Sequence, residues 1–164
     1  MEGGPALSKW KRVEGMTVIE LIIVIGLITL LAGLTLPFAG NFGQRNDEFA
    51  AASGVVQALR RAQFRSMLSE GGSNVWVRLV SGTGTDYMIY TGTSYATRNQ
   101  DTEEIYKLPD TVGVSFSFPS TTSTLNLRFA RITGNPFATG TVYLYSNAGD
   151  SSTIRVGLQG QITQ

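Results

Sequence analysis

The chain of 164 residues contains no cysteine and no histidine. Without cysteine, no disulfide can hold the fold together, whatever the redox state of the compartment. The two absences also exclude Ser-His-Asp and Cys-His catalysis and the usual zinc sites, since each of these needs one of the missing side chains. An enzyme would have to work with carboxylates, lysine, tyrosine or serine alone, and we predict a protein that is not an enzyme and that holds no metal or cofactor.

Charge is scarce as well, because charged residues make up 15% of the chain and the formal net charge is +1. A nearly neutral chain has no overall attraction to nucleic acid or to an acidic surface, although a local patch remains open. The length allows one long helix and one small domain with a core of its own.

The most informative stretch is an apolar run from Met16 to Leu36, which holds a single charged residue, Glu20. The run follows Gly15 and a basic stretch at residues 9–12. It is long enough to cross a bilayer as a helix, and the basic flank would keep the N-terminus in the cytoplasm. A carboxylate inside such a segment costs about 2.5–3.5 kcal/mol on insertion scales. We therefore expect Glu20 to pair with an amine.

The stretch from Lys11 to Ile25 resembles the class III signal sequence of type IV pilins and type II secretion pseudopilins. In that family a prepilin peptidase cuts after the glycine and methylates the new N-terminus. The resemblance implies cleavage after Gly15 and N-methylation of Met16, which stands where the family usually has phenylalanine. Thr17 matches the usual threonine at the second mature position. The amine of Met16, from the same chain or a neighbouring subunit, would then pair with Glu20 during filament assembly.

Two other interpretations of the N-terminal segment stay open. An uncleaved signal anchor would show the same apolar run and basic flank, but it would need neither Gly15 nor Glu20. A secretory signal peptide would place a small-residue cleavage site after the run. The stretch at residues 32–34 is a poor version of such a site.

We predict an α+β fold, in which a long N-terminal helix, first transmembrane and then amphipathic, packs on an antiparallel β-sheet or sandwich. The predicted segments are a cleaved leader (1–15), a transmembrane and assembly helix (16–37), an amphipathic helix (38–70) and a globular antiparallel β domain (71–164). Pro37 removes a backbone donor, and many family helices have a proline there, so we expect a kink or local melting between Pro37 and Gly43.

The amphipathic segment has to bury one face, and one sheet must cover that face because it has no other partner. The apolar residues that suggest this face are Phe42, Phe49, Val56, Leu59, Phe64 and Met67. Beyond Gly72, alternating patterns predict short strands. They lie at residues 75–80, 86–91, 104–108, 112–118, 125–129 and 142–145, with a final hairpin of 153–158 and 161–162. Residues 81–84 are predicted as a hairpin turn and residues 95–103 as a polar loop.

The second half carries a weaker resemblance, from Arg128–Gly134 through residues 140–144 to residues 153–156. It is similar to the GspH/FimT group of minor pseudopilins and minor pilins. This resemblance implies a structural subunit, at the tip or at the start of a type II secretion pseudopilus or a type IV pilus. The sequence does not choose between these two machines.

The resemblance also implies partners and a location. The partners would be other pilin-like subunits, the prepilin peptidase/methyltransferase and the membrane. The chain would cross the inner (cytoplasmic) membrane once, with its C-terminal domain outside the cytoplasm, and would then enter an extracytoplasmic filament. A plain single-pass membrane protein is the alternative that needs neither cleavage nor Glu20.

Two charged groups allow weaker hypotheses. A weak basic patch, which would serve nucleic acid or an acidic neighbour or would simply be a solvated helix face, comprises Arg60, Arg61, Arg65 and Arg155. Some members of the group take up DNA through arginines in the C-terminal hairpin, where this chain has only Arg155, so DNA binding is the less favoured alternative. The acidic residues suggest either a calcium loop or, because they lack its ligand spacing, an exposed loop. They are Asp101, Glu103 and Glu104.

Overall fold

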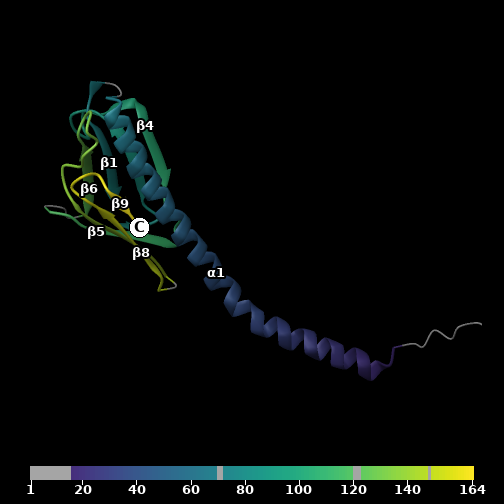
Figure 1. Ribbon diagram of the computed structural model, residues 1–164. Coiled ribbons are helices and arrows are strands. Elements are labelled where there is room, and N and C mark those ends of the chain that lie inside the picture. The colour runs from purple at the N-terminus through teal and green to yellow at the C-terminus, as the bar shows by residue number, and fades with distance from the viewer. Residues whose placement is uncertain (1–15, 70–71, 120–122, 148) are drawn as a thin grey trace, which may run out of the picture. The chain divides into compact units, whose positions relative to one another are not determined.

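The computed structural model describes residues 16–69, 72–119, 123–147 and 149–164, without the side chains of residues 35–42 and 44. By its contacts the chain divides into two compact units, with the boundary between Ala39 and Gly40. The elements, shown in Figure 1, are α1 (Val18–Met67), β1 (Val75–Val80), β2 (Gly82–Thr83), β3 (Asp86–Thr91), β4 (Asn99–Lys107), β5 (Val112–Ser117), β6 (Thr124–Phe129), β7 (Gly140–Ser146), β8 (Ser151–Val156) and β9 (Ile162–Thr163).

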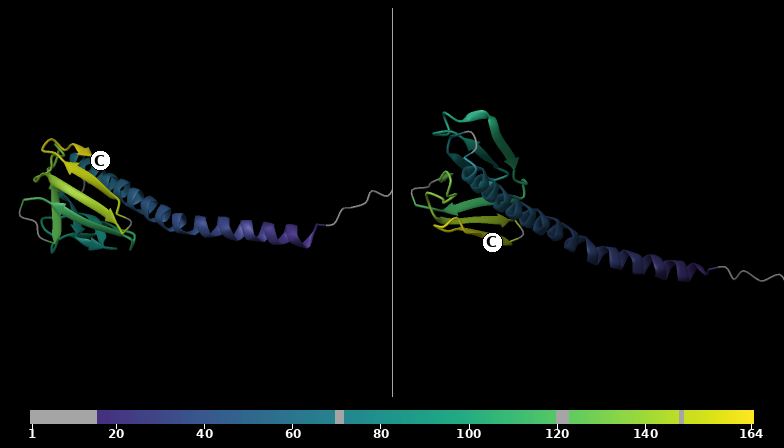
Figure 2. Two further views of the ribbon diagram at one scale, coloured as in Figure 1. Left: turned by 90° about the horizontal axis from the view of Figure 1, so that it is seen from below. Right: turned by 45° about the horizontal axis from the view of Figure 1, so that its top comes forward.

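The second unit is an α+β fold made of the C-terminal half of α1 and two antiparallel sheets. Sheet A has the strand order β4-β3-β1-β6, and sheet B has the order β2-β5-β7-β8-β9. In Figure 2 the helix lies along the side on which the two sheets diverge. The predicted fold class, a helix on antiparallel sheets, is confirmed at this level.

The alternation of side chains along the strands decides which face of each sheet is buried. In the centre of sheet A, Val75, Val77 and Leu79 of β1 are completely buried, whereas Trp76 and Arg78 are only half-buried. In sheet B, Val142 and Leu144 are buried, and the tyrosines that alternate with them along β7 are exposed. The inner faces of both sheets belong to one continuous core.

The helix contributes mostly small residues to that core. Its buried face contains Ala51, Ala52, Val55, Val56, Ala58, Leu59 and Ala62. The predicted face is therefore wrong in part: Val56 and Leu59 are buried, but Phe49 and Phe64 are 64% and 61% exposed and Met67 is 42% exposed. The side chain of Phe42 lies outside the described residues.

The small residues of α1 are explained by the short distance between the helix and sheet A. A Cβ atom added at Gly54 would lie 2.9 Å from the hydroxyl of Tyr87 in β3. Large side chains on this face would push the helix away from the sheet, because protein cores are close-packed. The phenylalanines therefore lie on the other faces of the helix, where there is room for them.

Two strands differ from the prediction. β4 begins at Asn99, so residues 99–103, predicted as loop, extend the strand, and its register with β3 shifts between Ile89 and Thr91. Its polar and charged sequence suits a strand at the edge of a sheet, which has to avoid pairing with other chains. β2, predicted as part of a hairpin turn, instead pairs with β5 in the other sheet.

In the first unit, α1 is helical from Val18 onward, and the helix continues without a break through Pro37 and Gly43. The local melting predicted there is therefore not observed, and a kink at Pro37 stays a prediction. Within the described residues, no stretch of helix combines the length and the apolar character that a membrane crossing requires. Residues 35–37 of the predicted transmembrane segment have side chains outside the described part.

The corrected helix face makes a direct stability prediction. Leu59→Ala removes a fully buried side chain and should lower the free energy of unfolding by about 2–5 kcal/mol, through lost burial and the cavity left behind. Phe64→Ala removes a larger side chain that is mostly exposed, so its cost should stay within about 0.5 kcal/mol. Urea unfolding of the full chain in detergent, followed by tryptophan fluorescence, measures both. Equal losses in the two variants would contradict the observed face.

Candidate functional site

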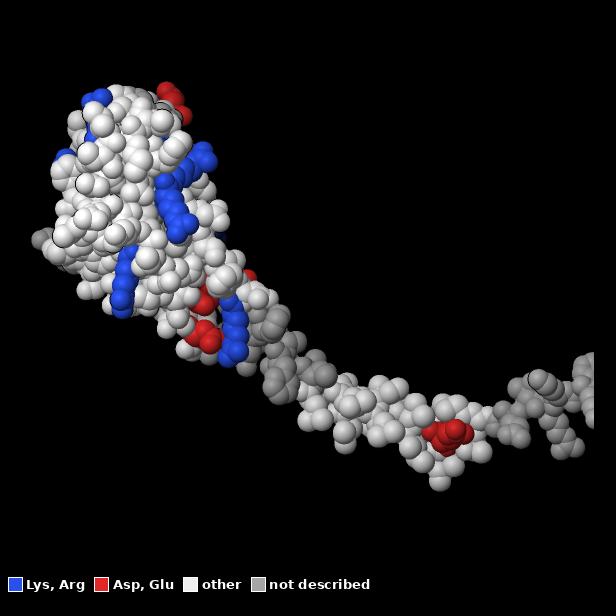
Figure 3. Space-filling view, viewed as in Figure 1, with Lys and Arg blue, Asp and Glu red and all other residues white. Residues whose placement is uncertain are grey.

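The first turns of α1 expose apolar side chains all around the helix. From Val18 to Leu34, every large apolar side chain is exposed, by between 38% at Val24 and 76% at Val18. In Figure 3 this part of the helix is white apart from a red group. A helix that is apolar on all sides is normally buried, either in protein or in lipid. This segment therefore needs a cover that the chain itself does not provide among its described residues.

The polar groups of this segment are satisfied within the helix, with one exception. The hydroxyl of Thr29 donates to the carbonyl oxygens of Ile25 and Gly26, at 3.0 and 2.9 Å. Glu20 is the one charged residue between Met16 and residue 44. Its carboxylate has no hydrogen-bond or ion-pair partner in the described part of the chain.

The backbone of Glu20 takes part in starting the helix. Its N–H donates to the hydroxyl of Thr17 at 3.3 Å, and the N–H of Leu21 donates to the carbonyl of Thr17 at 3.1 Å. Thr17 is thus the N-cap residue, and Glu20 stands at the position of the capping-box glutamate. This role was not predicted from the sequence, although the Thr-x-x-Glu spacing before an apolar run indicates it.

The capping position favours a negative charge at Glu20, since the N-terminus of a helix carries a partial positive charge. The capping hydrogen bond involves the backbone N–H of Glu20 and not its carboxylate, so both carboxylate oxygens remain available for a partner. Met16, whose amine would be that partner, precedes the helix and is 57% exposed. Gly15 lies outside the described residues, as does the side chain of Pro37.

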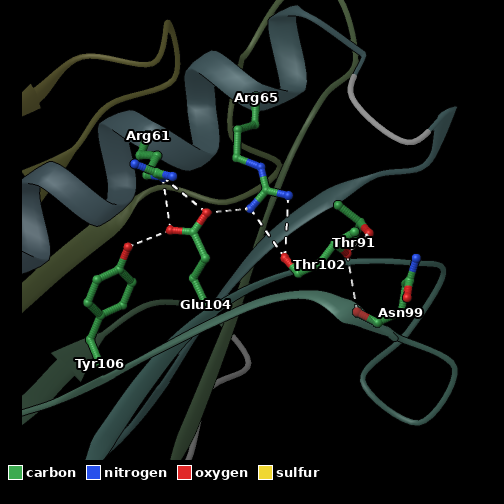
Figure 4. A network of polar contacts seen from close by, with 7 residues as sticks. All are labelled: Arg61, Arg65, Thr91, Asn99, Thr102, Glu104 and Tyr106. Atoms are coloured by element: carbon green, nitrogen blue, oxygen red, sulfur yellow. Dashed lines mark hydrogen bonds and ion pairs between the residues drawn. The ribbon is translucent and has the colours of Figure 1, made fainter.

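The predicted basic patch is partly neutralised inside the second unit. Figure 4 shows Arg61 and Arg65 of α1 directed at Glu104 of β4. The closest nitrogen–oxygen distances are 2.9 and 3.0 Å, and the Arg65 side chain is only 8% exposed. Arg65 also donates to the carbonyl of Thr102, at 3.4 and 3.5 Å. These two arginines hold β4 against the helix and do not form a free cationic surface.

The other two arginines of the predicted patch are placed differently. Arg60 donates to the carbonyl of Ile162 at 3.3 Å and so connects α1 with β9. Arg155 is exposed on β8 and has no acidic partner among the described residues.

The acidic residues of the predicted calcium alternative do not converge on a common point. Glu103 pairs with Arg98 at 2.6 Å, Glu104 faces the two arginines of α1, and Asp101 is exposed. Within the described residues, no three or more acidic, histidine or cysteine side chains form a group that could hold a metal ion.

Opposing effects determine the titration of Glu104. Burial raises its pKa, but hydrogen bonds from Tyr106 and Arg61, together with attraction to Arg61 and Arg65, lower the pKa by more, to below its ordinary value of 4.5. The hydroxyl of Tyr106 donates to Glu104 at 2.5 Å, and this hydrogen bond is the largest cause of the raised pKa of Tyr106. The ionised carboxylate is therefore the form that holds helix and strand together.

Comparison of the chain with protein-family models, with curated proteins and with solved structures finds no match.

The Glu104 network predicts a stability change in acid. Because the folded state lowers the pKa of Glu104, its contribution is complete above about pH 4.5 and is lost as the pH falls through the folded pKa. Glu104→Gln should cost roughly 1 kcal/mol at neutral pH, and this difference from wild type should shrink below pH 4.5. Urea unfolding at several pH values measures the difference. Asp101→Asn, at an exposed carboxylate of the same strand that has no ion-pair partner among the described residues, is the matched control and should change the free energy of unfolding by less than about 0.5 kcal/mol. A difference for Glu104→Gln that stays constant with pH would refute the assignment.

Proposed function

We propose that the chain is a structural subunit of a type IV filament, either a minor pseudopilin of a type II secretion pseudopilus or a minor pilin. The observation that carries the proposal is the carboxylate of Glu20, which has no partner among the described residues and lies in the first turn of α1, where residues 18–34 expose apolar side chains on every side. The resemblance of residues 11–25 to the class III signal sequence agrees with this proposal.

The apolar surface of residues 18–34 supports packing of the helix among other apolar helices or lipid chains. Both environments exclude water, and both make an unpaired carboxylate costly. A filament core built from such helices solves the problem if each carboxylate meets the amine of a neighbouring chain. Glu20 would then set how far one helix is shifted along the next, because any other register leaves the charge unpaired.

Cleavage after Gly15 creates the required amine. In the uncut chain, the nitrogen of Met16 belongs to an amide and carries no charge, so Glu20 would have no cationic partner there. Processing therefore acts as a switch that makes the subunit competent for assembly. We place the uncut chain in the inner (cytoplasmic) membrane through residues 16–37, with the β domain outside the cytoplasm, and the cut chain in an extracytoplasmic filament.

Within this proposal the second unit is the part that faces outward and meets partners. The role of a tip or initiating subunit rests on the resemblance of residues 128–156 to the GspH/FimT group. DNA uptake is not favoured by a specific contact, because Arg61 and Arg65 are already paired with Glu104.

The first test is the N-terminus of the mature protein. When the chain is expressed together with a prepilin peptidase, the protein recovered from membranes should begin at Met16 and be one methyl group heavier than the unmodified sequence. Intact mass and N-terminal sequencing measure both. Recovery of a chain that still begins at Met1 would instead support an ordinary signal anchor. A peptidase with an inactivated catalytic site is the matched control.

The role of Glu20 needs a variant that separates its charge from its place in the helix cap. Glu20→Gln keeps the capping-box geometry, since glutamine serves that position too, but it removes the charge. We expect processing and membrane insertion to persist while incorporation into filaments is lost. Cross-linking and sedimentation of sheared filaments measure incorporation.

Thr17→Ala is the matched control, because it removes the cap and keeps the carboxylate. It should lower helix stability by about 1 kcal/mol and leave incorporation largely intact. Normal incorporation of the Glu20→Gln chain would sink the charge-pairing proposal. Loss of incorporation only in the Thr17→Ala chain would assign the effect to the cap instead.

A further inference from the structure

The outer face of sheet B is rich in hydroxyl groups. The side chains that point away from the core on β5, β7, β8 and β9 are mostly hydroxyl-bearing and alternate with buried apolar residues. We call this surface the tyrosine–hydroxyl face and define it by Ser115, Thr141, Tyr143, Tyr145, Thr153, Arg155 and Thr163. None of its hydroxyl groups has a hydrogen-bond partner among the described residues.

Tyr145 lies flat on this face. It is paired across the strands with Gly113 of β5, and a Cβ atom added at that glycine would overlap the tyrosine ring. One side of the ring therefore covers the glycine backbone, while the residue remains 40% exposed. Tyr143, the next outward position along β7, is 41% exposed. The rise of the strand places the Cα atoms of these two tyrosines about 7 Å apart on the same face.

The aromatic rings on the outer side of sheet A offer no such surface, because their own neighbours cover them. Tyr95 has guanidinium groups at 3.9 Å, from Arg78, and at 4.4 Å, from Arg98. Trp76 has Tyr90 at 6.1 Å in a parallel stack and Arg128 at 5.6 Å. In contrast, no ring or cation contact is recorded for Tyr143 or Tyr145 within the described chain, so their rings can accept an external partner.

Arg155 is the cation among the residues that define this face, and it lies beyond the two tyrosines along it. Arg155 pairs with Thr141, the next outward position of β7 after Tyr143, and with Thr163 of β9. It lines two adjoining hollows of 280 and 360 Å3, and Thr163 lines both as well. Because Arg155 has no acidic partner among the described residues, its guanidinium donors are free to bind a carboxylate.

We propose that the tyrosine–hydroxyl face binds an acidic glycan, with sugar rings packed on the two tyrosines and a sugar carboxylate held by Arg155. A pyranose ring has one face of C–H groups, which matches the negative face of an aromatic ring, and its hydroxyl groups match the free serine and threonine hydroxyls. The charge of Arg155 complements an acidic sugar rather than a neutral one. This inference does not rest on filament assembly.

Two other occupants fit the face less well. A nucleic acid would need several cations along its phosphates, whereas this face has Arg155 alone. A neighbouring subunit would favour a surface that is apolar at its centre, whereas this face carries hydroxyl groups throughout. Both are outcomes that the experiment below can detect.

The test uses the full chain in detergent micelles and a fluorescently labelled oligomer of galacturonic acid. Its methyl ester is the matched neutral probe, since esterification removes only the charge. We expect the acidic oligomer to bind more tightly than the ester, measured by fluorescence polarisation. Arg155→Gln should weaken acidic binding about tenfold and abolish the preference for acid over ester. Tyr145→Ala should weaken the binding of both the acidic oligomer and the ester. Tyr145→Phe keeps the ring and should leave the binding of both unchanged.

Arg131→Gln changes an exposed arginine outside this face and should leave binding unaltered. The near-ultraviolet circular dichroism of each variant shows that the domain is folded. Absence of binding, or equal binding by wild type, Arg155→Gln and Tyr145→Ala, would overturn the proposal. Tighter, Arg155-dependent binding of an oligothymidine would also overturn it, because it would assign the face to a phosphate ligand. Cross-linking of a second subunit at Tyr145 that persists in the presence of the glycan would overturn it too.

Discussion

The close approach of α1 to the two sheets is the constraint on which the rest of the second unit depends. Where the sheets diverge, the helix closes the core with alanine, valine and one leucine, and at Gly54 even a methyl group would approach the hydroxyl of Tyr87 to 2.9 Å. This fit fills the core with side chains from three layers. It also explains why Phe49 and Phe64 are exposed, because rings of that size would separate the helix from the strands.

The same approach determines the electrostatics of the helix end. Once the helix lies against sheet A, Arg61 and Arg65 come within ion-pair distance of Glu104, which also accepts from Tyr106. The edge strand β4 is thus tied to the helix by charge, in addition to the packing of its Tyr106 against the core. Arg61 and Arg65 of the predicted basic patch are therefore partners of one carboxylate. Arg60 instead donates to the carbonyl of Ile162, and Arg155 has no acidic partner among the described residues.

The two units differ in where their surfaces find partners. In the second unit, Arg61, Arg65 and the outer rings of sheet A have partners within the unit, whereas the hydroxyl groups of the tyrosine–hydroxyl face have none among the described residues. The first unit satisfies its backbone and Thr29 internally, and leaves its apolar surface and Glu20 open. In the proposed filament, helices of other subunits and the amine of Met16 would complete the first unit. An acidic glycan would complete the face of sheet B.

Local pattern determined much of this protein from sequence alone. The strands at residues 75–80 and 125–129, and the buried residues within them, followed from alternation, which is a property of each strand by itself. The strand predicted at residues 112–118 is present as Val112–Ser117, but its first three residues are all buried. The candidate assembly site was also predicted from the sequence, because Glu20 is the one charged residue in the apolar run from Met16 to Leu36. Only the tertiary structure decided the buried face of α1, the extension of β4 to Asn99, the pairing of β2 with the other sheet and the neutralisation of Arg61 and Arg65. These four features depend on how closely segments far apart in the chain pack together. Hydrophobic periodicity describes one element at a time, so it carries no information about the side-chain volume that fits at a contact between two elements.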